Sequence, residues 1–247
     1  MAYALQWIRS LVFNISMYLA MPVIGLLYAP WAIVSREGGY GAVHAYCAWV
    51  QWSARWMIGL RCEVRGTPPT TGVLVAAKHQ SFLDILMIFG AMPRGRFIMK
   101  KELMWAPVLG AYAWRIGCVF VDRGKRGPAI TRMIRDVKAG NAEPGQLTIY
   151  SQGTRVAPGA YLPYKMGTGV LYEQLGQPCV PVACNVGVFW PKRGIYRKPG
   201  TAVVEFLPVI APGLTKGGFM VQLEQQVEAR SNALMAEAGF ALSTTTP

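Results

Sequence analysis

Charged residues are scarce in this chain of 247 residues. Asp, Glu, Lys and Arg make up 15% of it and hydrophobic residues 53%, whereas a soluble domain usually carries about 25% charged residues. The chain has 12 acidic residues and 25 Lys and Arg, so its net charge is +13. This positive charge favours an anionic partner. No Lys/Arg-rich run or nucleic-acid-binding motif accompanies this charge, which argues against nucleic acid. A phospholipid membrane surface fits both the hydrophobicity and the positive charge.

Histidine is also rare, and the cysteines show no metal-binding spacing. The chain has only two histidines, His44 and His79, and five cysteines without any C-x-x-C spacing. Zinc sites need closely spaced Cys and His ligands, so we expect no metal site and reduced, buried thiols in a cytosol-facing protein. No G-x-S-x-G segment is present, so covalent serine chemistry is poorly supported.

The first sixty residues contain the longest apolar segment. Residues 11–34 carry no charged side chain and exceed the length of about 20 apolar residues that a bilayer span needs. No small-residue cleavage site closes a short apolar core, which argues against a signal peptide. Pro22 and Pro30 are expected to kink the segment. A membrane span, a re-entrant hairpin and an interfacial helix all remain open.

The segment that follows, residues 40–60, has a narrow polar stripe. His44, Ala48, Gln51 and Arg55 recur at helical spacing and are flanked by aromatic residues, which is typical of a helix at the headgroup boundary of a membrane. A helix packed on the rest of the protein is the alternative. We therefore expect residues 1–60 to form a helical membrane-anchoring segment and residues 61–247 a separate domain.

The domain from residue 61 shows short apolar runs that alternate with helical stretches. Six strands are expected at residues 73–77, 96–100, 118–122, 147–151, 180–186 and 201–210. Helices are expected after the first three strands and at residues 216–239. Continuous apolar strands separated by helices predict an α/β fold with a mostly buried central sheet flanked by helices.

Polar clusters follow three of the expected strands. K-H-Q begins at residue 78, D-R-G-K-R at residue 122 and Q-G-T-R at residue 152. Ligands of open α/β sheets bind outside the carboxyl ends of the strands. The three clusters are therefore expected to converge on one crevice.

His79 and Asp84 are the candidate catalytic pair. Five positions along a helix turn through about 500°, so the two side chains cannot meet within one helix. They can meet if His79 precedes the helix and Asp84 lies in its first turn, with Ser81 as the N-cap. A carboxylate would orient the imidazole so that it can accept a proton from a hydroxyl. The alternative is an ordinary capping box, in which Asp84 only favours the helix start.

The other two clusters contain candidate phosphate ligands. Gly117, Phe120 and Arg123 form a G-x-x-F-x-x-R arrangement, and an Arg side chain can bind a phosphate through two donors. An ion pair between Arg123 and a nearby acid is the alternative. In the third cluster, Gly153 could let the backbone approach a ligand, with Thr154 and Arg155 as further donors; a simple turn is the alternative.

These motifs together, followed by the V-P-V-A strand at residues 180–183, resemble the glycerolipid acyltransferase family in order and spacing. The resemblance is to the bacterial 1-acyl-glycerol-3-phosphate acyltransferases and covers about residues 70–215. It implies that His79, oriented by Asp84, deprotonates the free hydroxyl of lysophosphatidic acid, which then attacks an acyl thioester to give phosphatidic acid. Arg123, Arg155 and the backbone of Gly153 and Thr154 would hold the phosphate of the acceptor. No metal or other cofactor is implied; acyl-carrier protein or coenzyme A would carry the acyl group.

Two residues depart from the family pattern. Gln152 stands where the family usually has Glu, and Lys78 precedes His79 where Asn is common. The loss of charge at Gln152 leaves open another lysolipid acceptor, such as lyso-ornithine lipid. A catalytically silent scaffold that binds anionic lipid is the alternative from another functional class. The resemblance implies a location on the cytoplasmic face of the inner membrane.

Overall fold

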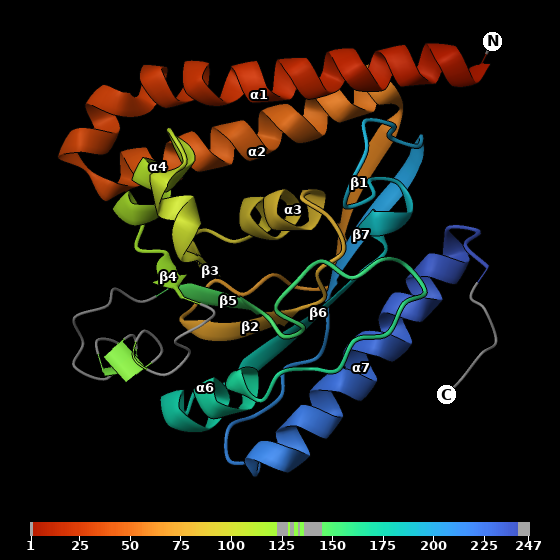
Figure 1. The fold of residues 1–247 in the computed structure, drawn as a ribbon. Helices are drawn as coiled ribbons and strands as arrows, with labels where there is room; N and C mark the ends of the chain where they lie inside the picture. The colour runs from red at the N-terminus through yellow and green to blue at the C-terminus, as the bar shows by residue number, and fades with distance from the viewer. Residues whose placement is uncertain (1, 123–127, 129–130, 133, 136–144, 242–247) are drawn as a thin grey trace.

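Two long antiparallel helices form the N-terminal layer of the molecule (Figure 1). The computed structural model describes residues 2–122, 128, 131–132, 134–135 and 145–241. Helix α1 (Ala2–Val34) is followed by α2 (Arg36–Ile58), and between them Ser35 caps α2 by accepting a hydrogen bond from the backbone N–H of Glu37. Helix α1 continues through Pro22 and Pro30, and it is long and apolar enough to cross a membrane.

Behind this hairpin, seven strands of the described residues form one sheet. They are β1 (Leu60–Arg65), β2 (Val73–Ala77), β3 (Gly95–Lys100), β4 (Val119–Val121), β5 (Gln146–Tyr150), β6 (Cys179–Cys184) and β7 (Gly200–Phe206). Their order across the sheet is β1-β7-β6-β2-β5-β3-β4. All neighbours are parallel except β6 and β7. The polar clusters after β2 and β5 therefore lie side by side at the carboxyl ends of these strands, because the two strands are parallel neighbours and Ala77 is in register with Tyr150.

Helices cover both faces of the sheet, as Figure 1 shows. One face carries α1, α2, α3 (Leu83–Ala91) and α4 (Leu109–Arg115), and the other carries α6 (Gly167–Leu175) and α7 (Lys216–Glu237). Each face has its own cluster of buried apolar side chains. All five residues of β2 and all six of β6 are buried, which is typical of central parallel strands. The predicted α/β fold with a mostly buried, helix-flanked sheet is confirmed.

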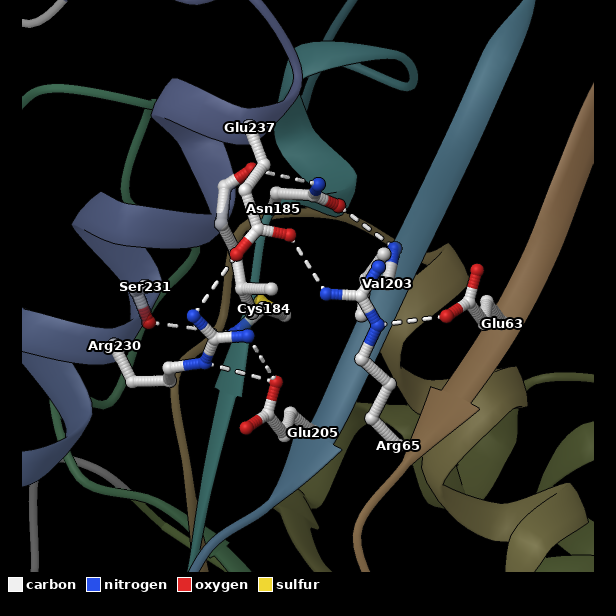
Figure 2. A network of polar contacts seen from close by, with 10 residues as sticks. Glu63, Arg65, Cys184, Asn185, Val203, Glu205, Arg230, Ser231 and Glu237 are labelled. Atoms are coloured by element: carbon white, nitrogen blue, oxygen red, sulfur yellow. Dashed lines mark hydrogen bonds and ion pairs between the residues drawn. The ribbon is translucent and has the colours of Figure 1, made fainter.

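Polar contacts fix the C-terminal part of α7 against β6, β7 and β1 (Figure 2). Arg230 of α7 binds Glu205 of β7 at 2.7 Å, and Arg65 of β1 binds Glu237 of α7 at 2.7 Å. Asn185, which follows β6, accepts a hydrogen bond from the backbone N–H of Val203 at 2.7 Å. These contacts hold α7 against β1 and β7, the two strands beyond the antiparallel β6–β7 pairing.

Several element boundaries differ from the sequence predictions. Strand β1 was not predicted; it is one of the two edge strands of the described sheet, β4 being the other, and its Arg61 and Glu63 are exposed. The helix expected across residues 101–114 is split into η1 (Lys101–Trp105) and α4, because Pro107 disfavours helical backbone at the residue before it. Strand β6 starts at Cys179, two residues before Pro181, and β7 ends at Phe206, four residues earlier than expected. The cationic helix expected after residue 127 lies mostly outside the described residues.

Helix α2 packs on the domain, which is the alternative left open by its sequence. Its buried residues include Tyr46, Cys47, Val50 and Ala54, and they belong to the same apolar cluster as α3 and the sheet. His44 lies against Phe89 and its Nε2 is 3.3 Å from the carbonyl oxygen of Pro93. The exposed side of α2 keeps the aromatic residues Trp52 and Trp56.

Candidate active site

His79 and Asp84 meet as a hydrogen-bonded pair. His79 lies in the segment between β2 and α3, and Asp84 lies in the first turn of α3. The His79 Nδ1 is 2.8 Å from the Asp84 Oδ1. Asp84 is fully buried, whereas 13% of the His79 side chain is exposed. The carboxylate is thus removed from solvent while the imidazole can still be reached by a substrate.

The second oxygen of Asp84 fixes the loop that carries His79. Asp84 Oδ2 accepts hydrogen bonds from the backbone N–H of Gln80 at 2.8 Å and of Ser81 at 2.7 Å. The sequence predicted Ser81 as the N-cap of α3, and this prediction is wrong: the cap position is Phe82. The Ser81 hydroxyl accepts a hydrogen bond from the N–H of Leu83 at 3.2 Å. One oxygen of Asp84 therefore fixes the loop before α3, and the other faces the imidazole.

An aromatic platform supports the histidine ring. Tyr150, the last residue of β5, stacks on His79 with ring centroids 3.9 Å apart, and Phe97 of β3 stacks on Tyr150 in turn. Burial, together with the nearby Asp84 carboxylate, raises the pKa of Tyr150, so its hydroxyl stays protonated. Tyr150 was not among the residues that the sequence predicted for the site. Its position at the end of a strand beside β2 was the available signal.

The pair opens onto a large apolar cavity of about 510 Å³. Its apolar wall comes from α1, α2, α3 and α4 and includes Ile24, Val43, Tyr46, Phe89, Tyr112 and Ala113. His79 lines the same cavity, together with a smaller polar group, Lys100, Asp122, Ser151, Lys165 and Thr168. Apolar volume next to an oriented imidazole can hold a hydrocarbon chain whose reactive end lies at the histidine.

The two remaining sequence clusters are placed less centrally. Gly117 lies in the turn after α4 with φ +80°, and Phe120 lies in β4; Arg123 lies outside the described residues. Of the third cluster, Gly153 lines the cavity, whereas Gln152, which is buried, donates to the carbonyl oxygen of Leu162 at 2.9 Å.

Thr154 and Arg155 complete the third cluster. Thr154 is partly exposed, and the guanidinium of Arg155 lies 3.5 Å from the carbonyl oxygen of Lys192. Among the described residues that line the cavity, neither of these two occurs.

Lys78, the unusual neighbour of His79, lines a second hollow, beside α7. Its Nζ is 2.6 Å from both carboxylate oxygens of Glu228, and Tyr164 donates to the same carboxylate at 3.0 Å. Only 2% of the Lys78 side chain is exposed. Within the described part of the chain, no group of three His, Cys, Asp or Glu side chains is arranged to hold a metal ion.

Two known proteins with similar sequences are both named as 1-acyl-sn-glycerol-3-phosphate acyltransferases. A 1-acyl-sn-glycerol-3-phosphate acyltransferase alpha from Mus musculus is 33% identical over 66% of this chain and 59% of its own length. A 1-acyl-sn-glycerol-3-phosphate acyltransferase from Pseudomonas aeruginosa is 28% identical over 79% of this chain and 77% of its own length. The match thus spans less than two thirds of the mouse protein.

A solved structure and a family model complete the comparison. The structure of the 1-acyl-sn-glycerophosphate (LPA) acyltransferase PlsC from Thermotoga maritima matches with a TM-score of 0.80 over 96% of this chain and all of that one; at 19% identity, this likeness shows a common fold. The model of the Acyltransferase family matches residues 61–185, which include His79, Asp84 and the strands around them. This chain therefore belongs to the Acyltransferase family.

Proposed function

We propose that this protein transfers a fatty acyl group from an acyl thioester to the free hydroxyl of 1-acyl-glycerol-3-phosphate and so forms phosphatidic acid. The observation that carries the proposal is the His79–Asp84 pair at an apolar cavity in a chain of the Acyltransferase family. The names of the relatives supply the acceptor. Acyl-carrier protein or coenzyme A is the carrier of the acyl group.

The hydrogen bond between His79 and Asp84 sets the direction of proton transfer. With Nδ1 facing the carboxylate, the proton of the neutral imidazole resides on Nδ1, and Nε2 has a free lone pair. Nε2 takes the proton of the acceptor hydroxyl as its oxygen attacks the thioester carbonyl carbon. The tetrahedral intermediate then expels the thiolate, and the imidazolium returns the proton to the leaving sulfur. No acyl-enzyme intermediate forms in this mechanism.

The apolar cavity supports the assignment of a long acyl chain. Each methylene that leaves water contributes about 0.8 kcal/mol, so a fatty chain gains much of its binding energy from the apolar wall formed by α1 to α4. The polar side chains lie at the same cavity as His79, where the head of the lipid would be.

The exposed face of α1 supports membrane docking in one leaflet. Large apolar side chains such as Leu26 and Leu27, each 73% exposed, lie along α1. The helix is tied to the domain near both ends, since Gln6 donates to the carbonyl oxygen of Arg197 and Arg115 donates to that of Ala32. A helix held along the domain cannot also cross the bilayer, so we propose that α1 lies in the interface, on the cytoplasmic face of the inner membrane.

Acyl transfer from a labelled thioester, offered lysophosphatidic acid or lyso-ornithine lipid, tests the reaction. We expect wild-type protein to form phosphatidic acid and His79→Ala to lose this activity. Product from lyso-ornithine lipid alone would keep the chemistry and overturn the acceptor. A folded protein that binds lipid and forms neither product would be a scaffold.

Sedimentation with anionic vesicles tests the docking surface. The double variant Leu26→Glu/Leu27→Glu should remain in the supernatant, because carboxylates resist burial among acyl chains. Val221→Glu is the matched control, since Val221 is also exposed but lies on α7, at the opposite face of the sheet. Equal sedimentation of both variants would contradict docking through α1.

A further inference from the structure

Two buried aliphatic hydroxyl groups line the polar part of the cavity, and the mechanism uses neither. Ser151 and Thr168 are 2% and 1% exposed, and both line the cavity. Among the described residues, neither side-chain oxygen has a hydrogen-bond partner. Burial of a hydroxyl group without a partner is unfavourable, and two such groups at one cavity indicate a polar ligand.

The same corner of the cavity contains the start of a helix. Helix α6 begins at Gly167, and its cap residue Met166 provides no side-chain hydrogen bond. Met166, Gly167 and Thr168 all line the cavity, and a Cβ added at Gly167 would meet no atom within 4 Å. The N-terminus of a helix carries a partial positive charge that favours anions; in α6 the backbone N–H of Thr168 already donates to the carbonyl oxygen of Lys165 at 3.2 Å, so the partial charge is the contribution of the helix.

A lysine adds a full positive charge to this corner. Lys165 is exposed, lines the cavity and precedes the start of α6. Its Nζ lies so close to Gly153 that a Cβ added there would be 2.7 Å away. The backbone N–H of Lys165 donates to the carbonyl oxygen of Ser151 at 2.9 Å, so the two hydroxyl-bearing segments and the lysine are joined directly.

We propose that Ser151, Lys165, Thr168 and the N-terminus of α6 bind a phosphate group, the phosphomonoester of the lysolipid acceptor. The inference rests on the proposed function. The cation of this corner, Lys165, is exposed. An exposed lysine suits the permanent charge of a phosphate better than the transient charge of a reaction intermediate. The corner is also close to the base: Ser151 follows Tyr150, whose ring stacks on His79. His79 lines the same cavity, so the phosphate and the free hydroxyl of one lysolipid would both lie in it.

Binding of glycerol 3-phosphate to the full-length protein in detergent, measured by isothermal titration calorimetry, tests the phosphate site without turnover. Loss of one hydrogen bond to a charged group weakens binding by about tenfold or more, so we expect this increase in Kd for Thr168→Val, Ser151→Ala and Lys165→Met. Thr168→Ser should bind like wild type. Thr148→Val is the matched control, because Thr148 is fully buried and also lacks a partner among the described residues but does not line the cavity.

Steady-state kinetics distinguish the phosphate of the acceptor from that of the thioester donor. We expect the three variants to raise the KM for lysophosphatidic acid about tenfold and to leave the KM for the donor unchanged. A higher KM for the donor alone would assign the site to the phosphopantetheine phosphate and overturn the proposal. Glycerol 3-phosphate binding that is absent in wild type, or equal in all variants, would overturn the phosphate site itself. If wild type binds glycerol 3-phosphate through Thr168 but does not acylate lysophosphatidic acid, only the proposed function fails.

Discussion

Replacement of Asp84 by Asn tests whether the carboxylate orients the catalytic imidazole. Asp84 Oδ2 accepts from two backbone N–H groups, at 2.8 and 2.7 Å, and Oδ1 faces His79 Nδ1 at 2.8 Å. An Asn side chain has a single acceptor oxygen, and two N–H donors compete for it on the loop side. Its amide NH₂ is therefore directed at His79, and it forces the imidazole proton onto Nε2.

An imidazole with its proton on Nε2 cannot take the proton of the acceptor hydroxyl. We expect kcat to fall about 10⁴-fold, the magnitude that the same substitution has in serine proteases. The fold should survive, because the loop-side oxygen is retained; exchanging charged for neutral hydrogen bonds costs about 1–2 kcal/mol of unfolding free energy. Asp84→Ala, in contrast, leaves two buried N–H groups without an acceptor and should cost about 2–5 kcal/mol.

The assay is release of free thiol from an acyl thioester in the presence of lysophosphatidic acid, with thermal unfolding as the measure of stability. The matched control is Glu173→Gln, which neutralises an exposed carboxylate on α6. Residues that act as one unit have non-additive effects, so His79→Ala/Asp84→Asn should be no slower than His79→Ala. If Asp84→Asn retained more than a tenth of wild-type kcat, the orienting role would be refuted.

Changes at other buried groups should alter chain-length preference, thiol reactivity and stability. Ala113→Phe partly fills the apolar cavity, and each methylene that can no longer be buried should lower the preference for long acyl chains about fourfold, as measured with a series of thioesters. Burial raises the pKa of Cys47 and Cys179 to about 12, so neither should react with iodoacetamide at pH 8 until the protein unfolds; the same shift predicts that stability decreases as the pH rises from about 9 towards 12. Glu228→Gln leaves the buried Lys78 ammonium without its carboxylate and should lower the free energy of unfolding by about 3 kcal/mol in urea titrations, whereas Lys78→Met/Glu228→Gln should restore part of it.

The sequence predicted six of the seven described strands, including the partly exposed β3 and β4, and missed β1. Strands β2 and β6 read as continuous apolar runs and were located within two residues of their observed starts. Strand β1 carries charged side chains at alternating positions, Arg61, Glu63 and Arg65, so it contains no apolar run that would predict a buried strand. The antiparallel pairing of β6 with β7 depends on the path of a loop, for which periodicity carries no signal.

The candidate site was predictable where it depends on neighbours in sequence. The spacing of His79 and Asp84 allowed the observed contact, provided that one residue precedes the helix and the other lies in its first turn. The stacking of Tyr150 on His79 and the backbone hydrogen bond from Lys165 to Ser151 depend on how separate segments pack against one another. Such contacts are set by the tertiary structure, and hydrophobic pattern alone does not contain them.

The cavity wall has a consequence for protein engineering. Ile24 of α1 and Val43 of α2 line the cavity together with residues of α3 and α4, so α1, the helix that we propose to dock on the membrane, also forms part of the cavity wall. Truncation of the first sixty residues would remove this wall and expose the apolar side of α3. A water-soluble, crystallisable form should therefore be made by replacing outward-facing side chains of α1 with polar ones and retaining the inner ones.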